Sequence, residues 1–462
     1  MGVESIVVAP TGEPASRHIE AADRSIEVDF DEASGIPSAA LPAILEEAGA
    51  DAAHLGYQGQ PEMFELASAA EKADVAVVGT DLDVLGALTD PATIRSAAER
   101  AHVRTVYDVG PLNRPREVGV LVAADAHGGT APIAECDRSL SADEHTLIHE
   151  TPSPELLFRA DGEAFRMALF ETARRLSTEL RYAGLLEVVF RLDADGLSWV
   201  SDVKIGLPRH HTLLEMVTGV DLVGLQLRIA SGEEIPDELG VVQLQGHALD
   251  VSILATDQAD AEVTSYSVPP SPQGRVRATS SATIGLPLPA DDRPLIAKVT
   301  THAPIRHRAI LAMDRLLAET RVEPFQTNIS TLRRMLGDFS FRAGQYDSES
   351  TLRFAARSRL CWSGSAETST SQKSASRRLS GRMFCPSTFW ESTISSGTSI
   401  RRNRTAPRRK RSWSLPAEPI STCSDPTSFH QLMSGSCPSS RRIRCGGTVT
   451  TSILPARRRP RI

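Results

Sequence analysis

The first 350 residues of this 462-residue chain contain little cysteine and little lysine. Cys136 is the single cysteine of this body, so it offers neither a disulfide framework nor a zinc site built on cysteines. Its three lysines, Lys72, Lys204 and Lys298, leave few point charges for binding phosphates. An apolar run of 18 residues is also missing, which argues against a membrane-spanning helix. The start, MGVESIVVAP, lacks the basic and long apolar regions of a signal peptide, so we expect a cytoplasmic protein.

Charge divides the chain into two parts. Residues 1–350 contain 29 Lys and Arg against 54 Asp and Glu, whereas residues 351–462 contain 21 against 4. The second part is rich in Ser, Arg, Thr and Pro, a composition that cannot bury enough apolar surface to offset its ordering entropy. We therefore predict that 351–462 is a disordered basic tail, explained most simply by translation in a shifted reading frame. Binding of nucleic acid is the disfavoured alternative, because the arginines lack interleaved aromatic residues and zinc spacing.

Hydrophobic patterns predict three blocks of α/β (α+β) structure in the body. Residues 1–103 alternate strand-like runs with helical patterns, as in a small doubly wound sheet. Residues 104–235 contain two strand pairs, around DAHGGT and DADG, separated by the helical pattern GEAFRMALFETARRLSTELRYAG. Residues 236–350 begin with strand patterns and close with the helices RHRAILAMDRLLAET and NISTLRRMLGDF.

The stretch LLEMVTGVDLVGLQLRIASGEEI, residues 213–235, resembles a segment of the biotin carboxylases that follows their catalytic strand. The likeness continues upstream into LLEVVFRLDADGLSWVSDVK and downstream into QGHALD, TNI and DFSFRAGQYD. It implies a biotin carboxylase-like fold, with the N-terminal domain over 1–103, the ATP-grasp domain over 104–235 and the C-terminal domain over 236–350. The family's lid subdomain and its glycine-rich loop have no counterpart between Val103 and Arg116. We therefore expect a reduced ATP-grasp domain that lacks its lid.

The resemblance assigns the metal positions of the family to altered residues. Its first metal carboxylate aligns with Val189, and Glu187 lies two residues earlier on the same strand face. Its second metal carboxylate aligns with Asp202, and its metal-binding asparagine aligns with Lys204. Glu187 and Asp202 are thus candidates for a degenerate metal site, in which Lys204 places a positive charge where the ion would lie. A solvated lysine at a hairpin end is the alternative interpretation.

The positions for bicarbonate and biotin are similarly altered. Gly206 aligns with the arginine of the catalytic loop, and His210 replaces the carboxylate that resembles the base. Arg277 matches the arginine that stabilises the biotin enolate in the family, although an ordinary strand arginine is an equal alternative. His210 and His211 would point to opposite faces of an extended segment, so we do not expect them to share one metal ion.

We expect two further motifs to have a structural role. His54, Gly56 and Tyr57 remain from a family motif, and we expect them to form a tight turn with a packed ring. The glycine pair of 125–129 is expected to form a hairpin turn, in place of a phosphate-binding loop.

These losses lead to a biotin-carboxylase-like protein without catalysis as the first hypothesis. It would pair with an intact biotin carboxylase or an acyl-CoA carboxylase subunit and bind no cofactor, whereas the family uses ATP, Mg²⁺ and biotin. One alternative is an ATP-dependent biotin carboxylase component of acetyl-CoA or propionyl-CoA carboxylase, completed by another chain. Another is a decaying gene product without function. The biotin carrier motif AMKM is missing from the sequence, so we do not expect this chain to be biotinylated.

The composition change near residue 350 yields a prediction about the gene. Translation of the coding DNA in its other frames should continue the biotin carboxylase pattern or lead to a carrier domain with AMKM. Sequencing the DNA around codon 350 checks this. A region in which neither alternative frame resembles the family would refute the frameshift explanation.

Overall fold

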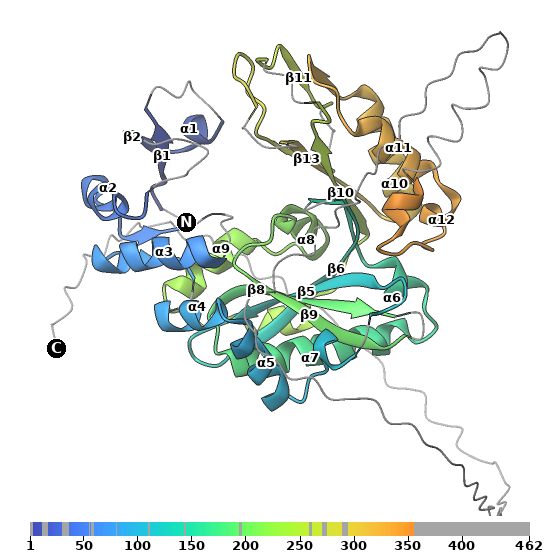
Figure 1. Ribbon diagram of the computed structural model, residues 1–462, viewed down its shortest axis with the longest axis horizontal. Coiled ribbons are helices and arrows are strands. Elements are labelled where there is room, and N and C mark those ends of the chain that lie inside the picture. The colour runs from blue at the N-terminus through green and yellow to red at the C-terminus, as the bar shows by residue number, and fades with distance from the viewer. Residues whose placement is uncertain are drawn as a thin grey trace, which may run out of the picture. The chain divides into compact units, whose positions relative to one another are not determined.

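An eight-stranded sheet organises the described part of the chain (Figure 1). The computed structural model describes residues 3–11, 17–29, 37–54, 56, 60–79, 81–109, 111–142, 145–193, 196–257, 261–269, 275–288 and 294–354. They belong to a unit that extends from Met1 to Ser371. The predicted tail from residue 355 onward lies outside the described residues.

The strands of the large sheet follow the order β12-β13-β10-β7-β6-β5-β8-β9, and every neighbouring pair is antiparallel. The bounds are β5 Arg116–Ala124, β6 Thr130–Ala142, β7 His145–Thr151, β8 Gly184–Leu192, β9 Ser198–Ile205, β10 His247–Leu254, β12 Val276–Ser280 and β13 Leu295–Ala303. Because β7 pairs with β10, the sheet joins strands from the two predicted domains 104–235 and 236–350.

Both faces of the central strand β5 are buried, which explains its continuous apolar sequence GVLVAA. Val118, Val120 and Val122 face the helix α7, Gly162–Leu180, whose buried residues Leu169, Ala173, Leu176 and Leu180 follow helical spacing. Leu121 and Ala123 face α8, His211–Thr218, and α9, Leu222–Ala230. The chain reaches α7 from β7 through the short helix α6, Pro154–Phe158.

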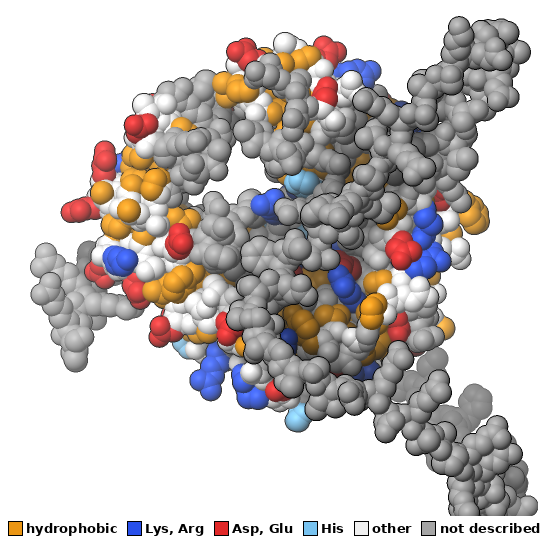
Figure 2. All heavy atoms as spheres, viewed as in Figure 1, with side chains coloured by type: hydrophobic (Ala, Val, Ile, Leu, Met, Phe, Trp, Pro, Cys, Tyr) orange, Lys and Arg blue, Asp and Glu red, His pale blue; other side chains and the backbone are white. Residues whose placement is uncertain are grey.

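The N-terminal residues alternate short strands and helices, as predicted. They form β1 Ile6–Pro10, α1 Arg17–Ala21, β2 Arg24–Val28, α2 Leu41–Ala48, β3 Ala52–Ala53, α3 Gln60–Lys72, β4 Ala76–Val77, α4 Leu82–Leu88 and α5 Pro91–Arg100. Among the described residues, β1 pairs with β2 and β3 with β4, both in parallel. Exposed carboxylates gather over α2 and α3 (Figure 2), among them Glu46, Glu47, Glu65 and Glu71.

The connection between α5 and β5 is short, as the sequence predicts for a domain without a lid. Between α5 and β5, the described residues 101–109 and 111–115 contain one short 3-10 helix, Val106–Asp108, and no longer element. The backbone N–H of Val200 donates to the carbonyl of Arg104 over 2.9 Å, and Thr105 bridges Val200 in parallel. The short connection therefore covers part of the edge strand β9, whose backbone groups would otherwise face solvent.

The C-terminal residues pack on β10 and β13. They contribute β11 Ser265–Ser267, α10 Arg306–Glu319, β14 Arg321–Glu323, α11 Ile329–Gly337 and α12 Phe339–Arg342. Met313, Leu332 and Phe341 lie in the core between these elements and the sheet. The core also includes Phe354, which is 8% exposed, so the folded body extends at least four residues beyond the predicted boundary at 350.

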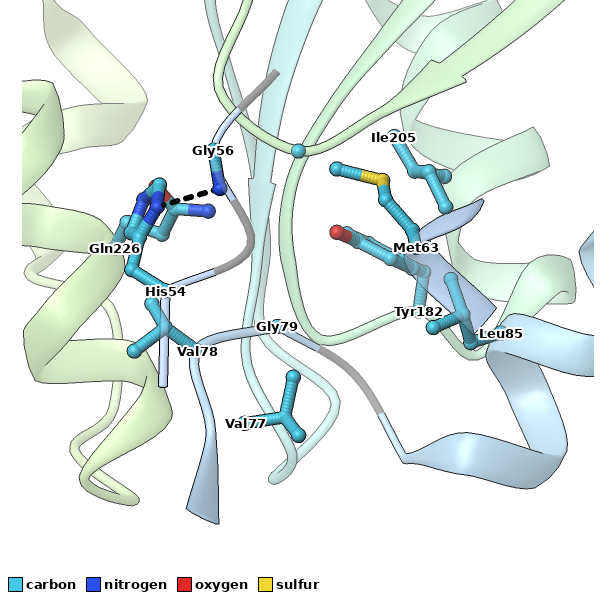
Figure 3. A pocket seen from close by; sticks show the side chains of 11 residues that line it. His54, Gly56, Met63, Val77, Val78, Gly79, Leu85, Tyr182, Ile205 and Gln226 are labelled. Carbon is cyan, nitrogen blue, oxygen red and sulfur yellow. Dashed lines mark hydrogen bonds between the residues drawn. The ribbon is translucent and has the colours of Figure 1, made fainter. Parts of the chain in front are cut away.

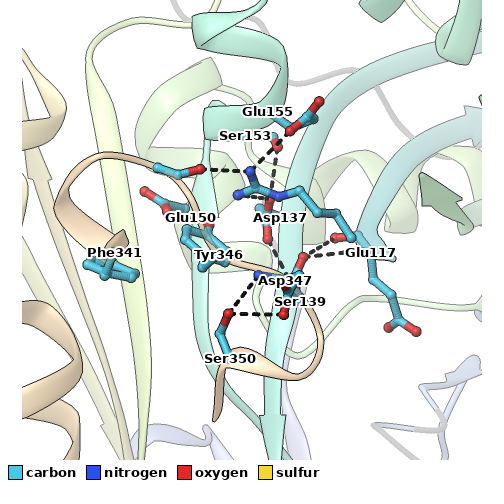
Figure 4. A network of polar contacts seen from close by, with 12 residues as sticks. Glu117, Asp137, Ser139, Glu150, Ser153, Glu155, Phe341, Tyr346, Asp347 and Ser350 are labelled. Atoms are coloured by element: carbon cyan, nitrogen blue, oxygen red, sulfur yellow. Dashed lines mark hydrogen bonds and ion pairs between the residues drawn. The ribbon is translucent and has the colours of Figure 1, made fainter. Parts of the chain in front are cut away.

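The buried carboxylate of Glu150 attaches these C-terminal elements to the sheet, and Figure 4 shows it beside Tyr346. Glu150 lies on β7 and accepts hydrogen bonds from Nε and Nη2 of Arg306 over 2.7 and 2.9 Å. It also pairs with Nε2 of His247 at 2.8 Å and accepts from the hydroxyl of Tyr346. Burial alone would raise the pKa of Glu150, but Arg306 and His247 lower it to about 2. Arg306 further donates to the carbonyls of Phe341 and Arg342, which fixes α12.

A second arginine anchors the segment that follows α12. Arg116 of β5 is buried and donates to the carbonyl of Gly344 over 2.8 Å and to Glu155 over 3.2 Å. Its guanidinium also lies 3.3 Å from the carboxylate of Asp137 and 4.2 Å from the ring centroid of Tyr346. Two buried arginines thus hold residues 341–346 against β6 and β7.

These contacts predict a large loss of stability for Arg306→Leu. The change leaves Glu150 as a buried charge without its main partner, which should lower the free energy of unfolding by about 3–5 kcal/mol. The measurement is urea unfolding at neutral pH. Arg333→Leu is the control, because it removes an ion pair between the exposed Arg333 and the partly exposed Asp314. It should leave the urea midpoint nearly unchanged, and an equal effect of the two variants would contradict the structural role of Glu150.

Candidate functional site

Glu187 of β8 is the centre of a polar cluster on the face of the sheet that α8 covers. Its carboxylate lies 2.7 Å from Nη1 of Arg138 and 3.2 Å from Nε2 of His210. The side chain of Glu187 is 4% exposed, and Gly119 on the neighbouring strand leaves the space that it fills. Burial alone would raise the pKa of Glu187, but Arg138 and His210 lower it to about 2. The carboxylate is therefore ionised at neutral pH and paired within the chain.

The other predicted metal ligand, Asp202, lies on the edge strand and is exposed. It stands opposite Val189 in the register of β8 and β9, while Lys204 stands opposite Glu187. The structure thus groups Glu187 and Asp202 on one face, with the cation of Arg138 beside them. Burial disfavours the charged form of Arg138, but Glu187 first and Asp202 among others raise its pKa. Arg138 was not predicted from the sequence.

His210 lies at the start of α8, where it is the N-cap residue. The prediction of an extended segment at His210 and His211 was wrong, because the chain turns into a helix after Pro208. His210 is 4% exposed, and its ring stacks on that of His149 with centroids 4.5 Å apart. His211 instead places Nδ1 3.2 Å from the carbonyl of Pro208.

A second set of pairs completes the cluster on β7, β10 and β13. Asp250 lies opposite His149 in the strand register, and its carboxylate lies 2.5 Å from Nζ of Lys298. Thr300 donates to the same carboxylate over 2.9 Å, and Nδ1 of His149 lies 3.6 Å from it. Burial first, and then Lys298 and His210, lower the pKa of His149 well below its usual value, so this imidazole is neutral. Within the described residues, three or more His, Cys, Asp or Glu do not gather as metal ligands.

Arg277 of β12 points its guanidinium at a carboxylate of this chain. Its Nη1 donates to Glu215 of α8 over 2.9 Å, and the arginine side chain is 53% exposed. The guanidinium therefore has an acidic partner within this chain.

Gly206, which aligns with the arginine of the family's catalytic loop, lies close to Met63, one of the side chains that Figure 3 shows around a small cavity. Gly206 has a φ of +86°, and a Cβ there would lie 3.1 Å from the terminal methyl of Met63. A neighbouring cavity of about 20 Å³ has room for roughly one water molecule. His54 lines it and accepts from the N–H of Gly56 over 3.0 Å, in agreement with the predicted tight turn. Tyr57 lies outside the described residues.

The turn at 125–129 joins β5 and β6, as predicted. Oδ1 of Asp125 accepts from the N–H groups of His127 and Gly129 over 2.9 and 2.8 Å. Oδ2 accepts from Ile235 over 2.9 Å. These N–H groups are engaged by the carboxylate, so they do not form a nest for phosphate.

Three family models match the chain in sequence order. They are the biotin carboxylase N-terminal domain over 1–85, the ATP binding domain of carbamoyl-phosphate synthase L chain over 78–238 and the biotin carboxylase C-terminal domain over 259–351. Among solved structures, the biotin carboxylase domain of a thermophilic 2-oxoglutarate carboxylase is similar with a TM-score of 0.70 at 20% identity, over 77% of this chain and 93% of that one. The fold is therefore that of a biotin-dependent carboxylase with an ATP-grasp domain.

Curated relatives support the same family. Biotin carboxylase of Haemophilus influenzae is 25% identical over 74% of this chain and 92% of that protein. Biotin carboxylase of Halalkalibacterium halodurans is 29% identical, and the chain spans about half of its length, 53%. The mitochondrial methylcrotonoyl-CoA carboxylase subunit alpha of Rattus norvegicus is 31% identical over 50% of this chain and 33% of that protein. The chain is a biotin carboxylase-like protein.

The cluster predicts that the free energy of unfolding decreases as the pH is lowered. The pKa of His149 in the folded state lies below its usual 6.5, and that of Glu187 is about 2 against 4.5. Both groups bind more protons in the unfolded state at low pH, so the free energy of unfolding should decrease first below pH 6.5 and further below pH 4.5. His149→Phe keeps a ring for stacking and should flatten the first decrease in urea unfolding experiments.

The exposed His307 provides the control, and His307→Phe should keep the wild-type slope. A wild-type stability that stays constant between roughly pH 7.5 and 5, or an unchanged slope in His149→Phe, would contradict this assignment.

Proposed function

We propose that this chain is a carboxylase-like subunit that does not catalyse biotin carboxylation and acts in the cytoplasm beside an intact biotin carboxylase or acyl-CoA carboxylase subunit. The observation that carries the proposal is the pairing of Glu187 with Arg138 and His210. In the proposed role the chain binds neither ATP nor Mg²⁺ nor biotin.

Magnesium binding would have to break this pairing. Mg²⁺ prefers octahedral oxygen ligands and is usually held by one or two carboxylates together with phosphate oxygens. The carboxylate of Glu187 is already neutralised at 2.7 Å by Arg138, which lies in a buried position and cannot be left without a partner at low cost. An incoming divalent cation would also meet the positive charge of Arg138 itself.

Nucleotide phosphates would find few lysines in the body. Lys298 is engaged with Asp250 at 2.5 Å, and Lys72 lies on the exposed surface of α3. Lys204 is exposed on the edge strand opposite Glu187. The lid that would close over a nucleotide is replaced by a short connection, so a bound phosphate chain would remain exposed to solvent and weakly held.

The exposed Arg277 favours a second candidate function. It matches the enolate-stabilising arginine of the family, and its side chain is 53% exposed. This candidate is an ATP-dependent biotin carboxylase whose missing groups come from another chain. The names of relatives support partner chains in general, since methylcrotonoyl-CoA carboxylase subunit alpha is one subunit of a carboxylase.

The primary proposal predicts no ADP release that depends on bicarbonate and free biotin, because neither metal nor phosphates are held. The assay uses the purified full chain with MgATP, with the biotin carboxylase of Haemophilus influenzae as the positive control. Release above a buffer blank that is lost in both Glu187→Gln and Arg277→Ala would overturn the proposal. Release that both variants retain indicates a contaminating enzyme.

The partner is tested separately. Affinity-tagged full chain, expressed in its source cells, should co-purify with a biotin carboxylase or acyl-CoA carboxylase subunit identified by mass spectrometry. Adding that subunit to the ADP assay decides between the two candidates, since a non-catalytic subunit adds no activity that depends on Arg277. Purification of the chain alone would contradict the proposed role as a subunit.

A further inference from the structure

A separate cavity of about 370 Å³ lies where β5 ends and β8 begins. Its lining includes Asp125 of the β5–β6 turn, Thr130 of β6, and Ser177, Thr178 and Arg181 around the end of α7. The last residues of α9 line it too, as do Gly79 and the carboxylate-bearing Asp81, which precede α4. The volume is at the lower end of the range for small-molecule sites, and none of the residues of the Glu187 cluster lines it.

One side of the cavity carries negative charge. Asp125 is 7% exposed, and although burial favours its neutral form, the N–H groups of Ile235, Gly129 and His127 lower its pKa, so it is ionised at neutral pH. The C-terminal ends of α7 and α9 both line the cavity, and each adds partial negative charge from its carbonyl groups. This side therefore favours a cationic group.

Ser177 lines the same cavity, and its hydroxyl is not satisfied by a hydrogen bond from the described residues. Its side chain is 1% exposed, and its hydroxyl has no hydrogen-bond partner among the described residues. A buried hydroxyl without a partner costs stability, and it can both donate and accept. Thr130 and Thr178 beside it already pair with each other through their hydroxyls over 3.3 Å. The hydroxyl of Ser177 is thus available to a ligand.

Arg181, the residue that follows α7, adds a positive charge to the lining of the cavity. This residue ends α7 in the left-handed region, with φ of 54° and ψ of 29°. That conformation is unfavourable for a residue with a side chain, and glycine would adopt it more easily. Arg181 is exposed, and within the described residues its guanidinium has no ion pair. Backbone strain of this kind is often found at functional sites, which directs attention to the side chain.

We propose that this cavity binds a small zwitterion the size of an α-amino acid. Its ammonium group lies between Asp125, the hydroxyl of Ser177 and the two helix ends, and its carboxylate pairs with Arg181. The lining carries groups of both charge signs, which match the two charges of such a ligand, whereas a simple cation or anion would leave one of these charges unmatched. The proposal does not depend on catalysis at the Glu187 cluster.

The test screens the twenty protein amino acids against the full chain by thermal unfolding, because a ligand that binds the folded state raises the unfolding temperature. Hits are then titrated by calorimetry. Putrescine and glutarate are included as ligands that carry only the cationic or only the anionic groups. At least one amino acid should bind with a Kd below about 10 mM and more tightly than either of these probes.

Three variants locate the site. Arg181→Gly retains the left-handed backbone and should weaken the best amino acid about tenfold or more, without lowering the unfolding temperature of the free protein. Ser177→Ala should weaken it several-fold, by about 1 kcal/mol or less. Arg174→Ala, on the same helix but paired with Glu171 outside the cavity lining, should leave binding unchanged.

Several results would overturn the proposal. They are a screen in which none of the amino acids binds, equal or tighter binding of putrescine or glutarate, and amino acid binding that Arg181→Gly leaves unaffected.

Discussion

The carboxylate of Glu150 is the interaction on which the attachment of the C-terminal elements depends. It is fully buried in β7 and is satisfied by Arg306, His247 and Tyr346, which come from three other segments of the chain. A buried carboxylate with these partners stays ionised, whereas removal of Arg306 leaves it as a costly buried charge without its main partner. Since β7 pairs with β10 as well, the same region joins the sheet across the two halves of the body. The fold is therefore retained although the lid is missing.

A different set of charges determines what the sheet can do chemically. Beside the positions that the resemblance assigns to metal and base, Arg138 and His210 contact Glu187, and His149 and Lys298 lie next to Asp250. Each carboxylate has a cation of the same chain within 2.7 Å. Internal ion pairs of this kind preserve a folded interior while they remove the open ligand positions that catalysis by a metal ion requires. This combination accounts for a chain that keeps the carboxylase fold and, as we propose, lacks its reaction.

Local sequence patterns were sufficient to predict much of the fold. The apolar runs on either side of DAHGGT predict the strands β5 and β6, and the spacing of Leu169, Ala173 and Leu176 predicts the buried side of α7. The missing lid was implied by the resemblance, because the segment between Val103 and Arg116 is too short to hold the family's lid subdomain. The resemblance identified Glu187 and His210 as candidate site residues. The structure places Nε2 of His210 3.2 Å from the carboxylate of Glu187. Arg277 was identified too, but its partner Glu215 was not predicted.

Contacts between distant segments could not be predicted in this way. Arg306 and Glu150 are 156 residues apart, and Arg138 and Glu187 are 49 apart. Neither hydrophobic period nor residue type indicates such a pair, and an arginine on a buried strand was the single available signal for Arg138. The error at His210 and His211 has a local cause, since the turn after Pro208 begins a helix where an extended segment was assumed.

The central claim is that internal ion pairs have replaced the nucleotide and metal site. Isothermal titration of the full chain with MgADP tests it most directly, with the biotin carboxylase of Haemophilus influenzae as the positive control. The account predicts no saturable heat for this chain under conditions in which the control binds. Saturable binding of one MgADP per chain that is abolished by Glu187→Gln would contradict it.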